Sequence, residues 1–193
     1  MAFEHYIRSG QKMLRCGYTT GTCAALAAAG AARLLLTGQR PALLCLRTPK
    51  GWPVEVEPAA LERAPGLARC AVRKDAGDDA DVTDGMLVWA SVRLTGAPGV
   101  QIDGGEGVGR VTKPGLDQPV GAAAINRVPR RMIAEAVQAE LDAAGCRGGA
   151  EVVISIPGGA ERARRTFNPL LGIEGGLSVL GTSGVVEPMS EQA

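Results

Sequence analysis

An acidic segment between residues 74 and 85 is the part of the sequence best suited to acid–base or cation chemistry. It carries five aspartates: Asp75, Asp78, Asp79, Asp81 and Asp84. Carboxylates this close repel one another unless solvent, a cation or donor N–H groups separate them. The segment lacks the ligand spacing and terminal glutamate of an EF-hand, which excludes a calcium loop of that kind. A solvated acidic turn and a functional aspartate cluster both fit the pattern.

Two other segments have the form of anion-binding sites. Residues 18–23 (YTTGTC) lead into an alanine-rich run, and the N–H groups at a helix start, together with hydroxyls, bind anions. Residues 151–159 predict a strand and a glycine turn, followed by a helix that carries Arg162, Arg164 and Arg165. Arginine binds carboxylates in a bidentate manner. Simple helix capping and an arginine-bearing surface helix are the structural alternatives.

The remaining residue types exclude several kinds of site. Residues 103–110 (DGGEGVGR) resemble a dinucleotide loop, but the residues after them do not begin a helix, which excludes a Rossmann site. His5 is the one histidine, so a Ser-His-Asp triad or a histidine metal site in the core is excluded. The five cysteines form no CxxC pair, and we expect reduced, mostly buried thiols.

Composition is typical of a globular domain of ordinary size. The chain has 193 residues, 46% hydrophobic and 21% charged, with a net charge of +1. This balance offers no basic surface for nucleic acid, and 3% aromatic content gives few stacking platforms. The sequence shows neither an uninterrupted bilayer-length apolar run nor a signal-peptide pattern. We therefore expect a cytoplasmic protein that binds neither nucleic acid nor membrane.

The order of elements predicts an α+β fold. After an irregular lead-in over residues 1–18, a long helix is expected, with Thr22 as N-cap and Gly38 as its stop. Its residues are small on every face, which predicts a buried helix. Further helices are expected at 130–144 and 160–166, and strands at 43–48, 54–57, 69–74, 86–94, 151–156 and 176–180. We expect one domain over residues 1–193, with helices packed on a mixed or antiparallel sheet in two layers.

Taken together, the motifs resemble one enzyme family. They are residues 14–25 (LRCGYTTGTCAA), 74–79 (KDAGDD), 81–83 (DVT), 105–109 (GEGVG), 112–116 (TKPGL), 124–126 (AIN), 128–130 (VPR), 132–133 (MI), 166–169 (TFNP), 171–176 (LGIEGG), 180–184 (LGTSG) and 188–190 (PMS). This ordered series resembles the cobalt-precorrin-5B C1-methyltransferases of anaerobic cobalamin (vitamin B12) biosynthesis. Asp84, Ala122 and Arg127 depart from the family pattern, in which histidine or asparagine, glutamate and proline are usual.

The resemblance implies transfer of a methyl group from S-adenosyl-L-methionine, the cosubstrate, to C1 of a cobalt-containing tetrapyrrole (corrin precursor). Cobalt enters within the substrate, so no protein-bound metal is implied. Family members continue into a second α/β domain after residues 188–190. We therefore expect this chain to supply the N-terminal part of the enzyme and to be inactive without the missing C-terminal domain or a partner chain. Whether it forms a homo-oligomer stays open.

The resemblance also suggests roles for individual residues. The candidates for a general base are Asp75, Asp78, Asp79 and Asp81. The candidates for binding the substrate and its carboxylate arms are Thr19, Thr20, Gly21, Thr22, Lys113, Arg130, Arg165 and Asn168. Contacts to the methyl donor are assigned to Gly105, Gly107, Gly109, Gly181 and Thr182, although no segment forms a typical cofactor loop.

Two other functions remain open at this point. A non-catalytic corrinoid-binding module that needs a partner chain would bind a tetrapyrrole without methylating it. A small-molecule kinase that uses the loop at residues 104–109 would bind ATP and depend on Mg²⁺. The sequence contains no P-loop pattern, which argues against the kinase.

Overall fold

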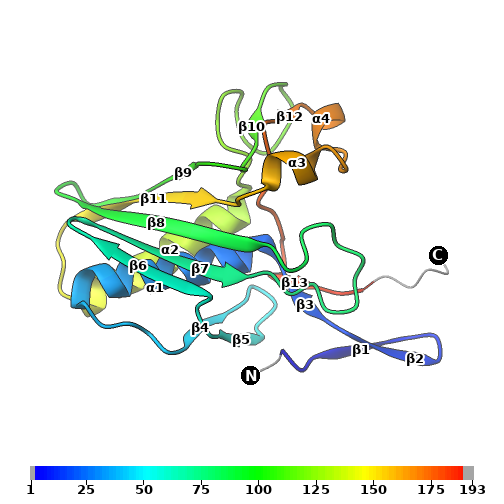
Figure 1. The fold of residues 1–193 in the computed structure, drawn as a ribbon, viewed down its shortest axis with the longest axis horizontal. Helices are drawn as coiled ribbons and strands as arrows, with labels where there is room; N and C mark the ends of the chain where they lie inside the picture. The colour runs from blue at the N-terminus through cyan, green and yellow to red at the C-terminus, as the bar shows by residue number, and fades with distance from the viewer. Residues whose placement is uncertain (1–2, 189–193) are drawn as a thin grey trace.

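A five-stranded mixed sheet forms the centre of the molecule (Figure 1). The computed structural model describes residues 3–188, so the last two residues of the 188–190 motif lie outside the described chain. The strands, in sheet order, are β6 (Ala60–Ala64), β7 (Leu67–Arg73), β8 (Leu87–Thr95), β11 (Gly149–Ser155) and β9 (Gly99–Gly104). Neighbouring strands are antiparallel except β11 and β9, which run parallel. The expected α+β class and mixed sheet are confirmed.

One face of the sheet is the core face because its strands alternate in burial. Along β8, Val88, Ala90 and Val92 are buried, while the residues between them are partly exposed. Ala90 lies opposite Cys70 of β7 and Ile154 of β11, which are also buried. Since side chains alternate across a strand, these residues form a continuous apolar surface on one side.

Two helices cover this core face and make the second layer (Figure 1). Helix α1 (Thr20–Thr37) packs on β7 and β8, and α2 (Arg127–Ala143) packs beside α1. Helix α2 is also the crossover that joins β9 to its parallel neighbour β11. The two helices are tied by an ion pair between Arg33 Nη2 and Glu140 Oε1, at 2.5 Å.

Helix α1 lies deep in the core because small side chains let its neighbours approach. A Cβ atom at Gly30 would lie 2.8 Å from Leu44 Cδ2 and 2.9 Å from Cys70 Sγ. The helix is the one element among the described residues that is long and apolar enough to cross a membrane, but 72% of it is buried inside the protein. Its length and composition are therefore those of a core helix, as the small residues predict.

Short elements surround the two layers. Two hairpins pair β1 (Tyr6–Ser9) with β2 (Lys12–Arg15), and β4 (Leu44–Arg47) with β5 (Pro53–Val56). Near the start of α1, β3 (Gly17–Tyr18) pairs with β13 (Val185–Val186). A lobe beyond the end of β11 contains β10 (Arg110–Val111), β12 (Ile173–Glu174), α3 (Gly159–Ala163) and α4 (Asn168–Leu171) (Figure 1).

Three expectations about elements are wrong. The lead-in is not irregular, because residues 6–15 form the β1–β2 hairpin. The N-cap of α1 is Thr19 rather than Thr22: Thr19 Oγ1 accepts the backbone N–H of Thr22 at 3.2 Å. Residues 176–180 form no strand, because Leu177 and Val179 make isolated bridges to two different segments. The hairpin has short, partly exposed strands with little periodic signal, whereas the bridges of Leu177 and Val179 join residues distant in sequence.

Candidate functional site

Several of the sequence motifs meet around one cavity of about 340 Å³. They come from the start of α1, the acidic segment after β7, and the segments at residues 166–171 and 177–180. The lining residues are Thr19, Thr20, Lys74, Asp81, Val82, Thr83, Thr166, Phe167, Asn168, Leu171, Leu177, Ser178, Leu180 and Val186. Four predicted site residues therefore lie together in the wall: Thr19, Thr20, Asp81 and Asn168.

The amino end of α1 is held against residues 180–184. The hydroxyl of Thr20 accepts a hydrogen bond from the backbone N–H of Leu180 and donates one to the backbone oxygen of Leu180, each at 3.3 Å. The hydroxyl of Thr22 is buried and donates to the backbone oxygen of Gly184 at 2.7 Å. Gly181 packs directly on Thr19, because a Cβ at Gly181 would lie 2.5 Å from Thr19 Cγ2. Thr22 and Gly181 thus join the two segments that form this wall.

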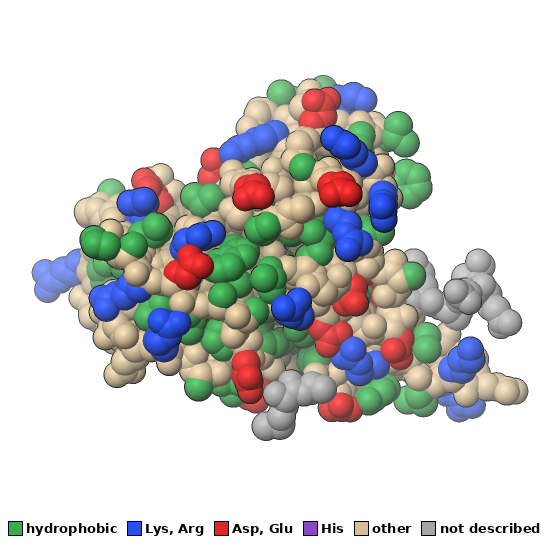
Figure 2. Space-filling model, in the orientation of Figure 1, with side chains coloured by type: hydrophobic (Ala, Val, Ile, Leu, Met, Phe, Trp, Pro, Cys, Tyr) green, Lys and Arg blue, Asp and Glu red, His purple; other side chains and the backbone are tan. Residues whose placement is uncertain are grey.

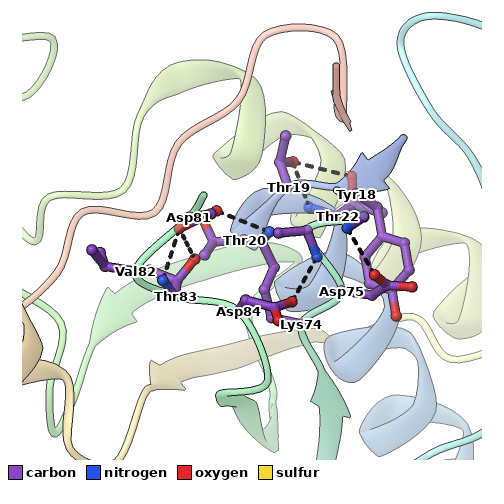
Figure 3. A network of polar contacts seen from close by, with 12 residues as sticks. Tyr18, Thr19, Thr20, Thr22, Lys74, Asp75, Asp81, Val82, Thr83 and Asp84 are labelled. Atoms are coloured by element: carbon purple, nitrogen blue, oxygen red, sulfur yellow. Dashed lines mark hydrogen bonds and ion pairs between the residues drawn. The ribbon is translucent and has the colours of Figure 1, made fainter. Parts of the chain in front are cut away.

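A buried ion pair forms the charged part of the cavity (Figure 3). The ammonium of Lys74 donates to Asp81 Oδ2 at 3.0 Å, and the two side chains are 1% and 23% exposed, respectively. The backbone N–H and the hydroxyl of Thr83 both donate to Asp81 Oδ1 at 2.7 Å. Burial acts to raise the pKa of Asp81, but the Thr83 hydrogen bonds and the Lys74 charge outweigh burial and lower it. Asp81 is therefore ionised at neutral pH.

Three other acids of the segment organise the chain outside this cavity. Asp75 accepts two hydrogen bonds from the Arg15 guanidinium, at 2.7 and 2.8 Å, and Asp78 accepts the backbone N–H of Arg15 at 2.7 Å. Asp84 accepts the backbone N–H of Ala76 at 2.9 Å. Figure 3 shows Asp75 directed away from Asp81. The geometry thus separates Asp75, Asp78 and also Asp79 from the cavity wall that contains Asp81.

Residues 167–180 supply an apolar rim to the same cavity. Phe167, Leu171 and Leu180 line the cavity and are 76%, 54% and 50% exposed, respectively. Asn168 is buried behind them, where Nδ2 donates to the Gly176 oxygen at 3.2 Å. Exposed large apolar side chains around a cavity are typical of a site that buries an apolar ligand surface.

The predicted basic contacts lie elsewhere. Arg130 donates to the backbone oxygens of three residues, at 2.8, 2.9 and 3.3 Å: Ile125, Ile102 and Ala123. Lys113 packs its stem against Gly172 in the lobe. Arg165 lines a different hollow of about 520 Å³, together with Asp84 and Arg162. The structure does not bring these three predicted substrate contacts to the cavity.

Three of the glycines assigned to the methyl donor, Gly105, Gly107 and Gly109, pack against backbone and side-chain atoms of the protein itself. A Cβ at Gly107 would lie 1.9 Å from the Ile156 oxygen, and one at Gly109 would lie 2.4 Å from Ile173 Cγ2. Gly105 lies against Ser155 in the same way, at 2.6 Å. These residues are glycine because two chain segments cross there in contact. At all three positions, the side on which a Cβ would stand is therefore filled by the protein itself.

The remaining groups that could react are distributed through the fold. Cys16, Cys23 and Cys70 are buried, Cys45 is exposed and Cys146 is partly buried. Burial raises the pKa of the Cys23 and Cys70 thiols to about 12, so both stay protonated at neutral pH. Within residues 3–188, no group of three or more His, Cys, Asp or Glu side chains is arranged to hold a metal ion.

Sequence reasoning missed Lys74, Thr83, Phe167 and Ser178 as cavity residues. A signal for Lys74 was present: it continues the alternation of Cys70 and Val72, and so stands where a core-facing side chain is expected. A charged residue at a core-facing position needs a partner, and Asp81 provides it. For Phe167, no local pattern distinguishes an exposed aromatic at a rim from one in a core.

We predict that Asp75→Asn lowers the free energy of unfolding by about 1 kcal/mol at pH 7, the range of a partly exposed ion pair. The hydrogen bond from Arg15 is the main reason that the pKa of Asp75 is lowered in the folded state. The Gly77 N–H also lowers this pKa, and burial opposes both effects. The contribution is therefore complete above the unfolded pKa of about 3.9 and is lost as the pH falls through the lower folded value. Urea unfolding at pH 7 and at pH 3 measures it. Asp79→Asn, in the same loop but not bonded to Arg15, is the control; equal stabilities at pH 7 would contradict the structural role.

We predict that Gly107→Ala lowers the free energy of unfolding by about 3 kcal/mol or more, because its methyl group would overlap the Ile156 oxygen at a backbone φ of +73°. Gly115→Ala is the matched control, since Gly115 also has positive φ (+96°) but nothing within 4 Å. That variant should lose only about 1–2 kcal/mol. Denaturant unfolding compares them, and equal losses would mean that the Gly107 segment is open enough to admit a ligand.

Comparison with known proteins connects this chain to a family. The sequence model of the CbiD family matches residues 7–188, nearly all of the described chain. Two relatives named cobalt-precorrin-5B C(1)-methyltransferase come from Alkaliphilus metalliredigens and Geobacillus kaustophilus. They are 47% identical over 98% of this chain and 53% identical over 95% of it, respectively. The chain spans about half the length of these relatives, 50% and 49%.

A solved structure agrees with the sequence comparison. The crystal structure of a cobalamin biosynthesis protein, CbiD from Archaeoglobus fulgidus, superposes with a TM-score of 0.71 and 36% identity. The match covers 96% of this chain and 59% of the other. The resemblance inferred from the ordered motifs is confirmed, and this chain belongs to the CbiD family.

Proposed function

We propose that this chain forms the tetrapyrrole-binding part of a cobalt-precorrin-5B C1-methyltransferase, which acts in the cytoplasm in cobalamin biosynthesis. The observation that carries the proposal is the composition of the 340 Å³ cavity, which combines an exposed apolar rim with a buried charged pair. A conjugated macrocycle has apolar faces and carboxylate-bearing arms. The cavity offers chemistry that matches both parts of such a ligand.

The rim supplies the apolar part of this recognition. Phe167, Leu171 and Leu180 expose half or more of their surface, and each would bury apolar area against one edge of the ring. Burial of apolar surface contributes roughly 25 cal/mol per Å². Figure 2 shows that the face drawn carries acidic and basic side chains around its apolar areas, rather than one uniformly basic field. We therefore propose that an acidic ligand is recognised by specific contacts in the cavity and not by a broad positive charge on the surface.

The chain's contribution to methyl transfer would be positioning. Holding the reacting carbon of a bound ring in one orientation lowers the entropic part of the barrier. Of the four aspartates considered as bases, Asp81 lines the cavity, and its lowered pKa suits a fixed negative charge better than a proton acceptor. S-adenosyl-L-methionine is the proposed methyl donor. Because Gly105, Gly107 and Gly109 are packed against other parts of the chain, we propose that much of the donor site lies outside this chain.

A titration with cobalt-precorrin-5B, followed by visible absorbance, tests the proposal. We predict that the chain binds the ligand and that Phe167→Ala weakens binding by about 5- to 10-fold, corresponding to about 1–1.4 kcal/mol of lost apolar contact. Leu170→Ala is the matched control, because Leu170 is 75% exposed on α4, the short helix that Phe167 caps, but does not line the cavity. Both side chains are exposed, so neither variant should unfold the chain.

Two results would contradict the proposal. An absorbance spectrum that does not change with the wild-type chain would mean that this chain does not hold the ring. Equal effects of Phe167→Ala and Leu170→Ala would mean that the ring binds somewhere other than this cavity. Binding without a methylated product when S-adenosyl-L-methionine is added agrees with a donor site completed outside this chain.

A further inference from the structure

The buried ammonium of Lys74 has more hydrogen-bonding capacity than the protein uses. Its side chain is 1% exposed and lines the 340 Å³ cavity. An ammonium carries three N–H donors. Within residues 3–188, Nζ donates one side-chain hydrogen bond, to Asp81 at 3.0 Å. Two donors of a buried cation thus remain for an acceptor beside the cavity.

The two members of the ion pair are not equally dependent on each other. Asp81 is 23% exposed and is also held by the N–H and the hydroxyl of Thr83, at 2.7 Å each. Lys74 is more deeply buried, and Asp81 is its one ion-pair partner within 4 Å among the described residues. A buried charge with few partners gains more from an additional counter-ion than a charge that is already satisfied. An anion that enters the cavity would therefore bind Lys74.

We propose that Lys74 is a carboxylate-binding residue of the cavity, which receives one acidic arm of the ligand while Asp81 serves as the resident counter-ion. This inference rests on the proposed function, since it assigns an anchor for the same ligand. An ammonium suits one carboxylate as a point charge, and a contact sheltered from water is screened little by salt. The hydroxyl of Thr20, also in the wall, already bonds to the backbone of Leu180. Among the residues that line the cavity, Lys74 is the one with a positively charged side chain.

Two stable probes that differ in their arms test the proposal. Dicyanocobyrinic acid carries carboxylate arms, and dicyanocobinamide carries amide arms on the same ring. We predict that Lys74→Met weakens binding of the acid probe by about tenfold or more, the effect of losing one hydrogen bond to a charged group, and leaves the amide probe unaffected. Absorbance titration of wild-type chain and variants measures both affinities, and thermal unfolding monitors the fold.

Asp81→Asn is the reciprocal variant. It removes the resident negative charge and leaves Lys74 in place, so binding of the acid probe should become tighter by a few-fold. If the pair has only a structural role, Lys74→Met and Asp81→Asn should instead weaken both probes alike. Weaker binding of the acid probe by Lys74→Met together with tighter binding by Asp81→Asn would therefore separate a role in ligand binding from a role in stability. If Lys74→Met does not fold, the Asp81→Asn variant alone decides: weaker binding of the acid probe overturns the proposal.

The outcomes also separate this proposal from the proposed function. If wild-type chain binds both probes and Lys74→Met changes neither affinity, the ring site stands and the role of Lys74 is wrong. If the wild-type chain binds neither probe, the ring site itself is wrong, and the Lys74 proposal falls with it. Selective loss of the acid probe supports both.

Discussion

The direct contact between the start of α1 and residues 180–184 is the constraint on which the cavity depends. Thr19, Thr20 and Thr22 bond to or pack on this segment, and side chains other than glycine would not fit at position 181 or 184 without displacement. The two segments are 160 residues apart in sequence. Their contact brings the cap of the core helix next to the apolar rim, and β3 and β13 extend the contact as a short two-stranded sheet.

The acidic segment performs two separate tasks because its aspartates face different neighbours. Asp75 and Asp78 fasten the β1–β2 hairpin through Arg15, and Gly77 lies against the backbone there, where a Cβ would be 2.2 Å from the Arg15 oxygen. Asp81 instead faces the cavity and neutralises Lys74. One loop thus fixes the lead-in segment on one side and supplies a charged wall on the other. Four of the five acids thus accept hydrogen bonds from separate donors, which explains how they coexist in a short stretch.

Much of the fold follows from local pattern. The alternation in β7, β8 and β11 and the small residues of α1 predict the two-layer core, because burial follows side-chain direction. Short elements such as the β1–β2 hairpin were not predictable, because their partly exposed, polar strands carry little periodic signal. Within the site, Thr19, Thr20 and Asp81 line the cavity as the sequence-based candidates, whereas Arg130 and the Gly105–Gly109 segment lie elsewhere, and the roles assigned to all of them stay predictions. The partners of Arg130 and Gly107, the oxygens of Ile102 and Ile156, lie on other strands or turns that sequence spacing does not reveal.

We propose that the tetrapyrrole ring lies against the apolar rim of the cavity. The most direct measurement is the position of the cobalt atom, located by anomalous diffraction from crystals of this chain grown with cobalt-precorrin-5B. We expect a cobalt peak beside Phe167, Leu171 and Leu180, with an acidic arm of the ligand directed toward Lys74. A peak elsewhere, such as over the open face of the sheet near Trp89 and Val153, would contradict it.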